Sequence, residues 1–555
     1  MQLINGLHFN NIRGDIYGAL SAAVVALPVA LVMGVASGAG PMAGIYGAII
    51  VGFFAAILGG TPAQVSGPTA PMTVVMALIV TEYTALFPND PVMGVTLAFS
   101  IVVMAGLFQI AFGLLKMSQF IELVPHPVIS GFMTGIGVFV ILIQVGPLLG
   151  HTSSVKPLEV IQTISAMVSD PHQASLILGL LALLIVYAVP RFLPQLNRLL
   201  PSSLLALIFA TVCYLIFFQH TGVSILGQVP IGLPDPVMPV LDWDLMPGMI
   251  VSAFFLALLG SLDSLLTSFV ADNVTKTYHK SNRELIGQGV GNTMAGLLGG
   301  LPGAGATSRT MINVKAGGQT PVSGVLHALV LLVILLAAGM LAAEIPHAVL
   351  AAILIKVGTD IIDWDYLGKI RIVPKAGVII MLTVLMLTVL IDPIMALATG
   401  MVMASLLFLK RMSELQLASM VINTKATEEM GLDIEETSLL AQAKDRVVLF
   451  EIGSAIGFGA AKGMLKRLAR FDDYDVLVID MTDVPVIDYT ACRTLDNIIA
   501  DTIALQREVM LVGVRSAVTK VLKKQKVLDR IHSDYIFVKR IGALREALNF
   551  VNSKK

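Results

Sequence analysis

The sequence predicts an α-helical polytopic membrane protein that ends in a small α/β domain. Of its 555 residues, 56% are hydrophobic and only 13% are charged, and the mean hydropathy is +0.85, whereas soluble domains carry about 25% charged residues. The charged residues gather from roughly Lys410 onward. We therefore expect three parts: a transmembrane domain at residues 1–411, a linker at 412–439 and an α/β domain at 440–555.

About fourteen apolar segments follow one another in the first part of the chain. They begin near Ile16, Gly44, Pro71, Val95, Pro127, Ser175, Ser203, Met249, Ile286, Ala306, Val322, Ala348, Ala376 and Met395. If all of them cross the bilayer from a cytoplasmic N-terminus, the cytoplasmic loops receive nearly every Lys and Arg of this part. The outer side then receives Lys156 alone, as the positive-inside rule favours. We expect both termini to be cytoplasmic.

Glycine and proline interrupt the third and tenth segments. The third opens with Gln64-Val-Ser-Gly-Pro-Thr-Ala-Pro71, and the tenth with Leu301-Pro-Gly-Ala-Gly-Ala-Thr-Ser-Arg-Thr310. In a division into seven and seven segments, these two occupy equivalent places, a pattern that points to the binding site of a transporter. Half-helix N-termini there would present unpaired N–H groups and favour an anion. Ordinary turns between helices are the alternative.

One carboxylate interrupts the eighth apolar segment. From Met249 to Ala271 the only ionisable side chain is Asp263, and a charge inside a membrane helix costs about 2.5–3.5 kcal/mol on insertion scales. Thr267 lies four residues further on, and thus on the same helix face. The two oxygens suit a hard cation such as Na⁺, a proton would need only the carboxylate, and a hydrogen-bonding role without an ion is a third interpretation.

Two further charged residues flank this region. Arg309 is the one cation within the tenth segment, where it could pair with Asp263, bind substrate or set the electrostatic field for an anion. Glu284 borders the polar loop 273–283, and for it we expect a solvated or gating role.

These residues resemble a known family. The pattern SLDSLLTSFVADNVTKTYHKSNRELIGQGVGN, followed by GLPGAGATSRT, is similar to the sulfate permease (SulP) family, solute carrier family 26. Within the family, the resemblance is greatest to cyanobacterial sodium-dependent bicarbonate transporters. It implies fourteen helices in a seven-plus-seven inverted repeat, as in uracil permease relatives, and elevator-type alternating access between the third and tenth half-helices.

The resemblance also implies site residues, carried over position by position. The sodium site falls on Asp263, Thr267, Gly305, Ala306 and Thr307. The anion site falls on Thr69, Ala70, Ala306 and Thr307. Aspartate at position 263, where many proton-coupled relatives carry glutamate, favours sodium coupling.

The charged tail alternates strand and helix patterns. Buried strands are predicted in the stretches that follow Arg446, Asp475 and Glu508, with helices at 460–469, 490–506 and 517–528. This arrangement predicts a small α/β sheet domain and resembles a STAS domain. Thr490, after Asp488, is a candidate phosphorylation site at a helix N-terminus, although an ordinary capping role is the preferred interpretation.

The sequence thus favours a secondary active anion transporter over other classes. Na⁺-coupled bicarbonate uptake is the first hypothesis; a proton-coupled sulfate or C4-dicarboxylate transporter, an anion channel and a membrane-tethered signalling module are alternatives. No nucleophile–base set, P-loop or metal-spaced Cys/His cluster occurs, so neither an enzyme nor a cofactor is expected. The expected partners are the anion, Na⁺ or H⁺, the lipid of a bacterial inner membrane, a second copy in a homodimer and a cytoplasmic regulator of the STAS domain, but no nucleic acid.

Overall fold

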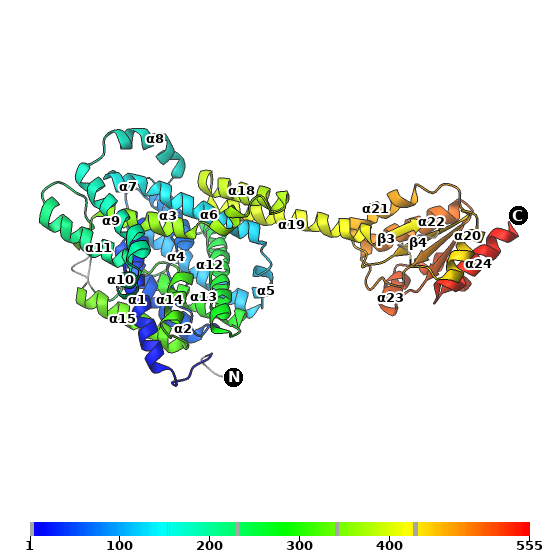
Figure 1. Cartoon of the computed structure of the whole chain (residues 1–555), viewed down its shortest axis with the longest axis horizontal. Helices are drawn as coiled ribbons and strands as arrows, with labels where there is room; N and C mark the ends of the chain where they lie inside the picture. The colour runs from blue at the N-terminus through cyan, green and yellow to red at the C-terminus, as the bar shows by residue number, and fades with distance from the viewer. Residues whose placement is uncertain are drawn as a thin grey trace. The chain divides into compact units, whose positions relative to one another are not determined.

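The computed structural model describes residues 5–152, 154, 156–227, 232–338, 343–425 and 431–554. The chain forms two compact units, Met1–Val402 and Met403–Lys555, which are described separately below (Figure 1).

The first unit is helical apart from two short strands. Its longer helices are α1 (Ile12–Ala36), α2 (Pro41–Leu58), α3 (Ala70–Leu86), α4 (Pro91–Leu114), α6 (His126–Ile143), α8 (Pro157–Ser169), α9 (Gln173–Phe192), α11 (Ser202–Cys213), α12 (Met246–Thr275), α13 (Ser281–Leu297), α14 (Thr307–Lys315), α15 (Pro321–Ala338), α16 (His347–Ile361), α18 (Lys375–Leu390) and α19 (Pro393–Ala418). Short helices α5 (Ser118–Ile121), α7 (Val145–Leu149), α10 (Pro194–Leu199) and α17 (Trp364–Gly368) join them, and the strands are β1 (Ser66–Gly67) and β2 (Ala304–Gly305).

Each of the fourteen apolar segments coincides with one of these helices. Proline begins many of them, since it occupies the first turn of α2, α3, α4, α6 and α12. Its missing N–H would be unpaired there in any case, and its fixed φ suits the first helical turn.

Seven of the described helices are long and apolar enough to cross a membrane, and α3, α15 and α18 are shorter apolar helices. Helix α13 is apolar on part of its surface only, because it carries buried Glu284, Gln288 and Asn292. The predicted number of fourteen crossings, and the inverted repeat, therefore stay predictions.

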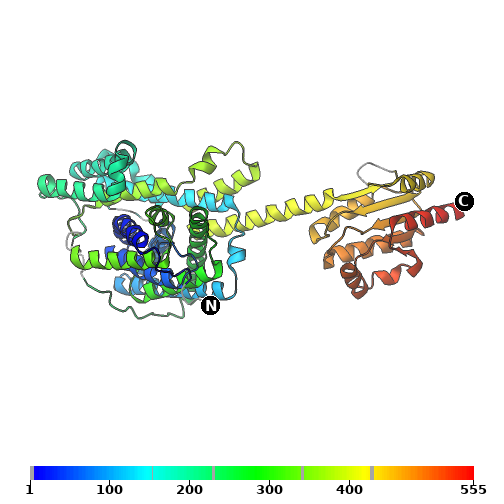
Figure 2. The same cartoon turned by 60° about the horizontal axis from the view of Figure 1, so that its bottom comes forward.

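The helices of the first unit pack in two groups. The first group contains α1–α4 and α12–α15, in which α13 lies against α2 and α4, and α15 lies against α1 and α2. The second group contains α6, α7, α9, α11, α16 and α18. The groups meet mainly where α1 contacts α11 and α16 and where α3 contacts α6; Figure 2 shows α1, in dark blue, surrounded by other helices of the unit.

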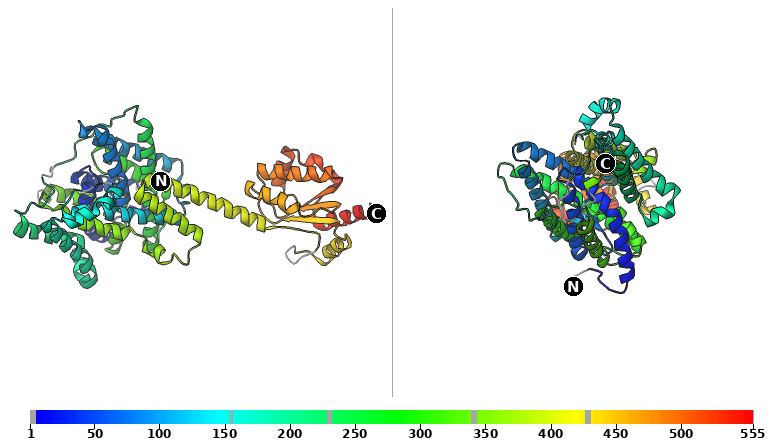
Figure 3. Two further views of the ribbon diagram at one scale, coloured as in Figure 1. Left: turned by 90° about the horizontal axis from the view of Figure 1, so that it is seen from above. Right: turned by 90° about the vertical axis from the view of Figure 1, so that its left-hand side faces the viewer.

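The second unit is a five-stranded sheet with helices on both faces (Figure 3). Its strands are β3 (Met420–Asn423), β4 (Val447–Ile452), β5 (Val476–Asp480), β6 (Glu508–Val512) and β7 (Ile536–Phe537), in the order β3-β4-β5-β6-β7. Strand β3 is antiparallel to β4, and the other neighbouring strands are parallel. The helices are α20 (Ile434–Gln442), α21 (Phe458–Leu468), α22 (Tyr489–Ala504), α23 (Ser516–Lys524) and α24 (Arg540–Ser553).

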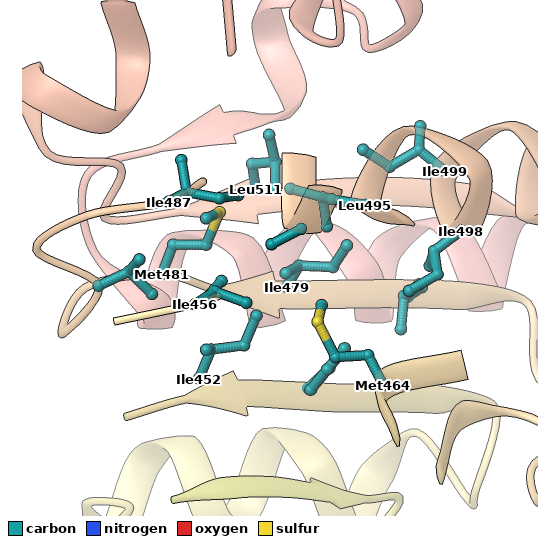
Figure 4. Close-up of a cluster of buried hydrophobic side chains, with 14 of the residues drawn as sticks. Ile452, Ile456, Met464, Ile479, Met481, Ile487, Leu495, Ile498, Ile499 and Leu511 are labelled. Atoms are coloured by element: carbon teal, nitrogen blue, oxygen red, sulfur yellow. The ribbon is translucent and has the colours of Figure 1, made fainter. Parts of the chain in front are cut away.

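Side chains of the central strands alternate between two cores, as the period of two in a strand requires. Val448 and Phe450 of β4 pack in one core with α21, α22 and α23. Figure 4 labels Ile479 of β5 in this core, together with Met464 of α21 and Leu495 of α22. Val447 and Val478 pack in the other core with α20 and α24. A parallel sheet buried on both faces explains why these strands read as continuous apolar runs.

The three predicted strands after Arg446, Asp475 and Glu508 are β4, β5 and β6, and the predicted helices correspond to α21, α22 and α23. The segment 412–439, for which we expected a linker, contributes the last turns of α19, strand β3 and the start of α20. Residues 426–430 of that segment lie outside the described residues. The sheet therefore takes an edge strand from this segment.

Candidate functional site

The two interrupted segments meet in the first helix group. Strand β1 pairs antiparallel with β2, with Ser66 opposite Gly305 and Gly67 opposite Ala304. Helix α3 begins directly after β1, at Ala70, and α14 begins directly after β2, at Thr307. Two helix N-termini, more than two hundred residues apart in sequence, therefore start from one pair of strands.

Glycines allow β1 and β2, whose pairing we call the strand crossing, to approach until their backbones are in contact. A Cβ atom on Gly303 would lie 2.5 Å from the carbonyl carbon of Gly67. A Cβ atom on Gly67 would lie 2.7 Å from Nη1 of Arg309. A side chain on Gly303 would push the strands apart, and one on Gly67 would displace the guanidinium of Arg309, so the glycines that interrupt the segments fit this crossing.

The helix N-termini that leave this crossing are not capped by the side chains that precede them. The residues before α3 and α14, Thr69 and Ala306, have extended backbones, and neither caps its helix with a side chain. The first N–H groups of a helix have no partner within the helix and form the positive end of its dipole. Two such ends in one place make a site that suits an anion.

Asp263 differs from the other buried carboxylates of the first unit. Asp15 accepts hydrogen bonds from the backbone of Gln319 and Thr320 and from the Thr320 hydroxyl, at 2.8–3.0 Å, and Glu284 accepts four. Oδ2 of Asp263 has no hydrogen-bond partner among the described residues, although the side chain is only 9% exposed. A buried carboxylate with a free oxygen is costly unless a cation or a proton satisfies it.

Thr267 joins α12 to the second strand of the crossing. Its hydroxyl donates to the carbonyl of Gly305 at 2.8 Å, and it lies 2.7 Å from the hydroxyl of Thr307. Because the single hydroxyl proton of Thr267 is used on Gly305, Thr307 donates the second bond. Ser264, one residue after Asp263, accepts from the Gly305 backbone N–H at 3.1 Å. Helix α12 thus fixes the backbone that the sodium prediction uses.

Arg309 connects the start of α14 to the entrance of α3. It is 5% exposed, and Nη2 donates to the carbonyl of Pro68, while Nη1 has no partner among the described residues. Asp263 interacts electrostatically with Arg309, but the two form no ion pair within 4 Å in the described part of the chain. Of the three predicted roles, direct pairing with Asp263 is therefore absent in this conformation.

A cavity of about 1290 Å³ opens onto these groups. It is lined by Thr69, Ala70, Asp263, Gly305, Ala306, Thr307 and Arg309. Every predicted cation-site and anion-site residue except Thr267 thus faces one cavity, and Thr267 lies buried behind Gly305. The cavity also reaches apolar residues of α1 and α16, so it lies between the two helix groups, and it extends to Lys315 and Lys356.

Glu284 is not solvated, because the residue is 1% exposed and its carboxylate bonds Gln288 within α13 and the loop before β1; a gating role stays a prediction. Sequence reasoning also missed Gln64, Gln288 and Asn292, which are fully buried around the crossing. A spacing of four between Glu284, Gln288 and Asn292 was the available signal, since it places three polar side chains on one helix face.

In the second unit, Asp488 caps two helices. Its carboxylate accepts from the backbone N–H of Ala491, in the first turn of α22, and from that of Phe458, the first residue of α21. Thr490 is exposed in the first turn of α22. This position is accessible, and phosphorylation of Thr490 stays a prediction.

Comparison with known proteins decides the family. The model of the sulfate permease family matches residues 12–384, which is most of the first unit, and that of the STAS domain matches residues 438–539. The chain belongs to the sulfate permease family. It is a multi-pass membrane anion transporter with a C-terminal STAS domain.

One curated relative and one solved structure support this family assignment. The bicarbonate transporter BicA of Picosynechococcus sp. is 41% identical over 553 residues, which are 99% of this chain and 97% of that protein. The solved transmembrane domain of a cyanobacterium BicA is 46% identical with a TM-score of 0.66, and it covers 71% of this chain and 100% of its own.

A distant family member shares the fold. The structure of murine solute carrier 26 family member A9, an anion transporter, has a TM-score of 0.82 at 17% identity. It covers 98% of this chain and 92% of its own. The family architecture, including the STAS domain, thus persists at low sequence identity.

Proposed function

We propose that this sulfate permease family member takes up bicarbonate with Na⁺ by elevator-type alternating access. The observation that carries the proposal is the meeting of two helix N-termini beside a buried carboxylate that keeps one oxygen without a partner. Relatives 41% identical over nearly the whole chain are named bicarbonate transporters.

The cation site in this proposal uses oxygen ligands from three elements. Asp263 supplies the negative charge, the Gly305 carbonyl and the hydroxyls of Thr267 and Thr307 supply neutral oxygens, and Ala306 supplies backbone between them. Hard cations prefer such ligands. One negative charge in the ligand set matches the single charge of Na⁺, so the occupied site is neutral overall.

The anion site uses the two helix ends. The first turns of the helices that begin at Ala70 and Thr307 line the cavity with Thr69, whose side chain interacts with the Asp263 carboxyl; Pro71, the second residue of α3, contributes no N–H. Without a cation, Asp263 would repel an anion at this range. Bound Na⁺ removes that repulsion, and Arg309 adds positive potential nearby, which couples the two solutes.

Alternating access requires one body to move against another. The two helix groups meet mainly through α1 and α3, and the cavity between them is lined by Leu20, Val24 and Val25 of α1 and by Ile353 and Val357 of α16. Apolar surfaces without specific hydrogen bonds can slide at low cost, so we assign the moving body to the first group, which holds the whole site.

Several finer points belong to the same proposal. Fourteen crossings in two inverted repeats would place both termini and the STAS domain in the cytoplasm of a bacterial cell, with the chain in the inner membrane. We also propose a homodimer, a cytoplasmic protein that binds the STAS domain, and the division of the chain at 1–411, 412–439 and 440–555. Phosphate at Thr490 would meet the N-terminus of α22.

Radiolabelled uptake in proteoliposomes tests the coupling. We expect bicarbonate uptake to saturate, to require a Na⁺ gradient, and to fall at least about a hundredfold in Asp263→Asn and Asp263→Ala, since both remove the charge that the cation needs. Asp360→Asn is the matched control, because Asp360 lines the same cavity but pairs with Lys356 on its own helix.

Other outcomes assign other functions. Full uptake without Na⁺, driven by a proton gradient and competed by sulfate or succinate, would indicate the proton-coupled alternative, in which the free oxygen of Asp263 takes a proton. Large anion currents that persist in Asp263→Asn would indicate a channel.

A further inference from the structure

One face of α13 carries three buried polar side chains, which we call the polar ladder. Glu284, Gln288 and Asn292 follow one another at a spacing of four residues, and their exposures are 1%, 0% and 1%. Residues at this spacing stack on one helix face, so the ladder extends over about 12 Å of the helix.

The first rung holds the chain before β1. Oε2 of Glu284 accepts from the backbone N–H groups of Gly60 and Thr61 at 2.8 and 2.9 Å. Oε1 accepts from Nε2 of Gln64 at 2.8 Å. Gln64 in turn lies directly against Gly305, because a Cβ atom on that glycine would be 2.3 Å from Nε2 of Gln64.

The other two rungs hold one strand each. Gln288 donates from Nε2 to the hydroxyl of Ser66 in β1 at 2.6 Å and to Glu284 at 2.8 Å. Asn292 accepts from the backbone N–H of Gly303 at 2.7 Å and donates to its carbonyl at 2.9 Å. The amide of Asn292 therefore binds the residue before β2 in the way that a neighbouring strand would.

Helix α13 is a rigid support for these contacts. Its glycines lie at backbone contact with both neighbouring helices: a Cβ atom on Gly287 would lie 2.5 Å from the nitrogen of Gly59, and one on Gly289 would lie 2.6 Å from the carbonyl of Gly106. Helix α13 cannot shift against α2 or α4 without steric overlap, so the ladder presents fixed hydrogen-bonding positions.

Burying polar residues at these positions costs free energy in a membrane protein. Apolar side chains would insert more favourably, and buried polar groups cost free energy unless they are fully bonded. Most of the ladder's hydrogen bonds go to the two segments that form the crossing. The exceptions are the bond between its first and second rungs and the bond that Asn292 donates to Oε1 of Gln109 in α4 at 2.7 Å, while Oε1 of Gln288 has no partner among the described residues. Because most of its hydrogen-bond partners lie in the two segments of the strand crossing, we expect the ladder to act on the position of these segments.

We infer that Glu284, Gln288 and Asn292 are positioning residues that set the register of β1 against β2, and thereby the apparent affinity of the transport site. This inference rests on the proposed function. Ser66 lies opposite Gly305 in the strand pair, and Gly305 provides the carbonyl that Thr267 binds. A change in the register of either strand would displace the cation ligands. If the correct register is present in only a fraction of the molecules, the apparent affinity for the cation falls by that fraction.

The test compares Gln288→Met and Asn292→Leu in the full-length protein with Gln144→Met, a buried glutamine at the end of α6 outside the ladder. We expect both ladder variants to raise the Na⁺ concentration for half-maximal bicarbonate uptake about fivefold or more. The maximal rate should stay within about twofold of the wild type. Hydrogen–deuterium exchange at 64–67 and 302–306 should become faster in both variants and stay unchanged in Gln144→Met.

Ser66→Ala removes the hydrogen bond between Gln288 and Ser66 by deleting its acceptor, and it changes the side chain less than Gln288→Met does. It should reproduce the shift of Gln288→Met, and the double variant should shift no further than either single one. This variant keeps the inference testable if Gln288→Met or Asn292→Leu fails to fold.

If hydrogen–deuterium exchange becomes faster but the half-saturating Na⁺ concentration does not change, the inference is overturned and the ladder is a purely structural feature. Unchanged exchange would overturn it as well, because the rungs would then not hold the register. Failure of the proposed function is seen separately, in the wild type, as uptake without Na⁺. The half-saturation for the transported anion then serves as the kinetic readout.

Discussion

At the scale of the residue, the site depends on how closely its backbone segments approach. Gly67, Gly303 and Gly305 each lie where a Cβ atom would overlap a neighbour within 2.7 Å. The polar groups of the site are held by hydrogen bonds of ordinary length, so their positions follow from the positions of these glycines. A methyl group can therefore do as much harm here as the loss of a ligand.

Gly305→Ala is expected to reduce uptake by at least about 90%. The added Cβ would lie 2.3 Å from Nε2 of Gln64, which Glu284 holds in place, and overpacking of this kind costs about 1–3 kcal/mol. Gly368→Ala is the control, since nothing lies within 4 Å of its Cβ position. Uptake is measured per transporter recovered in the membrane; wild-type rates in Gly305→Ala would contradict the prediction.

The sequence alone could identify Asp263 because a lone charge in a long apolar run has few explanations. The broken segments could be identified because glycine and proline cluster in two of the apolar segments. Gln64 could not be identified, since a neutral amide is neither costly enough nor rare enough to attract notice, and Gln288 could be identified only through its spacing of four from Glu284 and Asn292. The contacts that give Gln64 and Gln288 their role lie more than two hundred residues away in sequence.

At the scale of the element, the second unit contains one cluster whose charges are unbalanced. Arg540, at the start of α24, bonds Glu436 of α20, Glu451 of β4 and Asp480 of β5, at 3.1–3.3 Å. One cation thus joins three elements and binds three carboxylates.

Strand β3 was not predicted from the sequence, because its four residues lie in a charged stretch and only their pairing with β4 makes them a strand.

Arg540→Met should destabilise the second unit by about 3 kcal/mol, because it leaves buried carboxylates facing one another. Arg545→Met is the control, since Arg545 pairs with Glu435 at an exposed position, and exposed pairs contribute little. Pulse proteolysis of the second unit, Met403–Lys555, at increasing urea measures the change; equal midpoints for the two variants would refute the prediction.

The same cluster predicts a pH dependence. Burial raises the pKa of the Glu451 carboxyl; Arg540 opposes this shift, and the charges of Asp480, Asp483 and Glu436 add to it. A carboxyl whose pKa is higher in the folded than in the unfolded chain contributes stability at low pH and loses it as the pH rises through the folded value.

The urea midpoint of the second unit should therefore fall as the pH rises from the ordinary pKa of a glutamate upward. The fall should be smaller in Glu451→Gln, which cannot ionise at this position. A midpoint that rises over this range in the wild type, or equal slopes in the two proteins, would contradict the assignment.

At the scale of the whole molecule, the transport site and the STAS domain belong to different units. Every residue of the proposed cation and anion sites lies between Thr69 and Arg309, within the first unit. The transmembrane domain of a relative, matching 71% of this chain, was solved as a chain of its own. The properties of the site should therefore not need the second unit.

A chain that ends at Met412 is expected to keep a half-saturating Na⁺ concentration within about twofold of the full-length value. Its maximal rate is free to change, because the regulator or the neighbouring copy that we propose would act on the rate of the whole cycle. Uptake in proteoliposomes over a range of Na⁺ concentrations measures both. A larger shift in half-saturation would show that the STAS domain reaches the site.

The strand crossing also has a consequence for the order of synthesis. The segment 60–66 is bonded by Glu284, Gln288, Thr310 and Asn313, which the ribosome adds 220 to 250 residues later. At about 5–20 residues per second, that delay is on the order of 10 to 50 seconds. During that interval the entrance of α3 has no partners for its backbone, so the nascent N-terminal half is open to mistaken insertion and to membrane proteases until the tenth segment emerges.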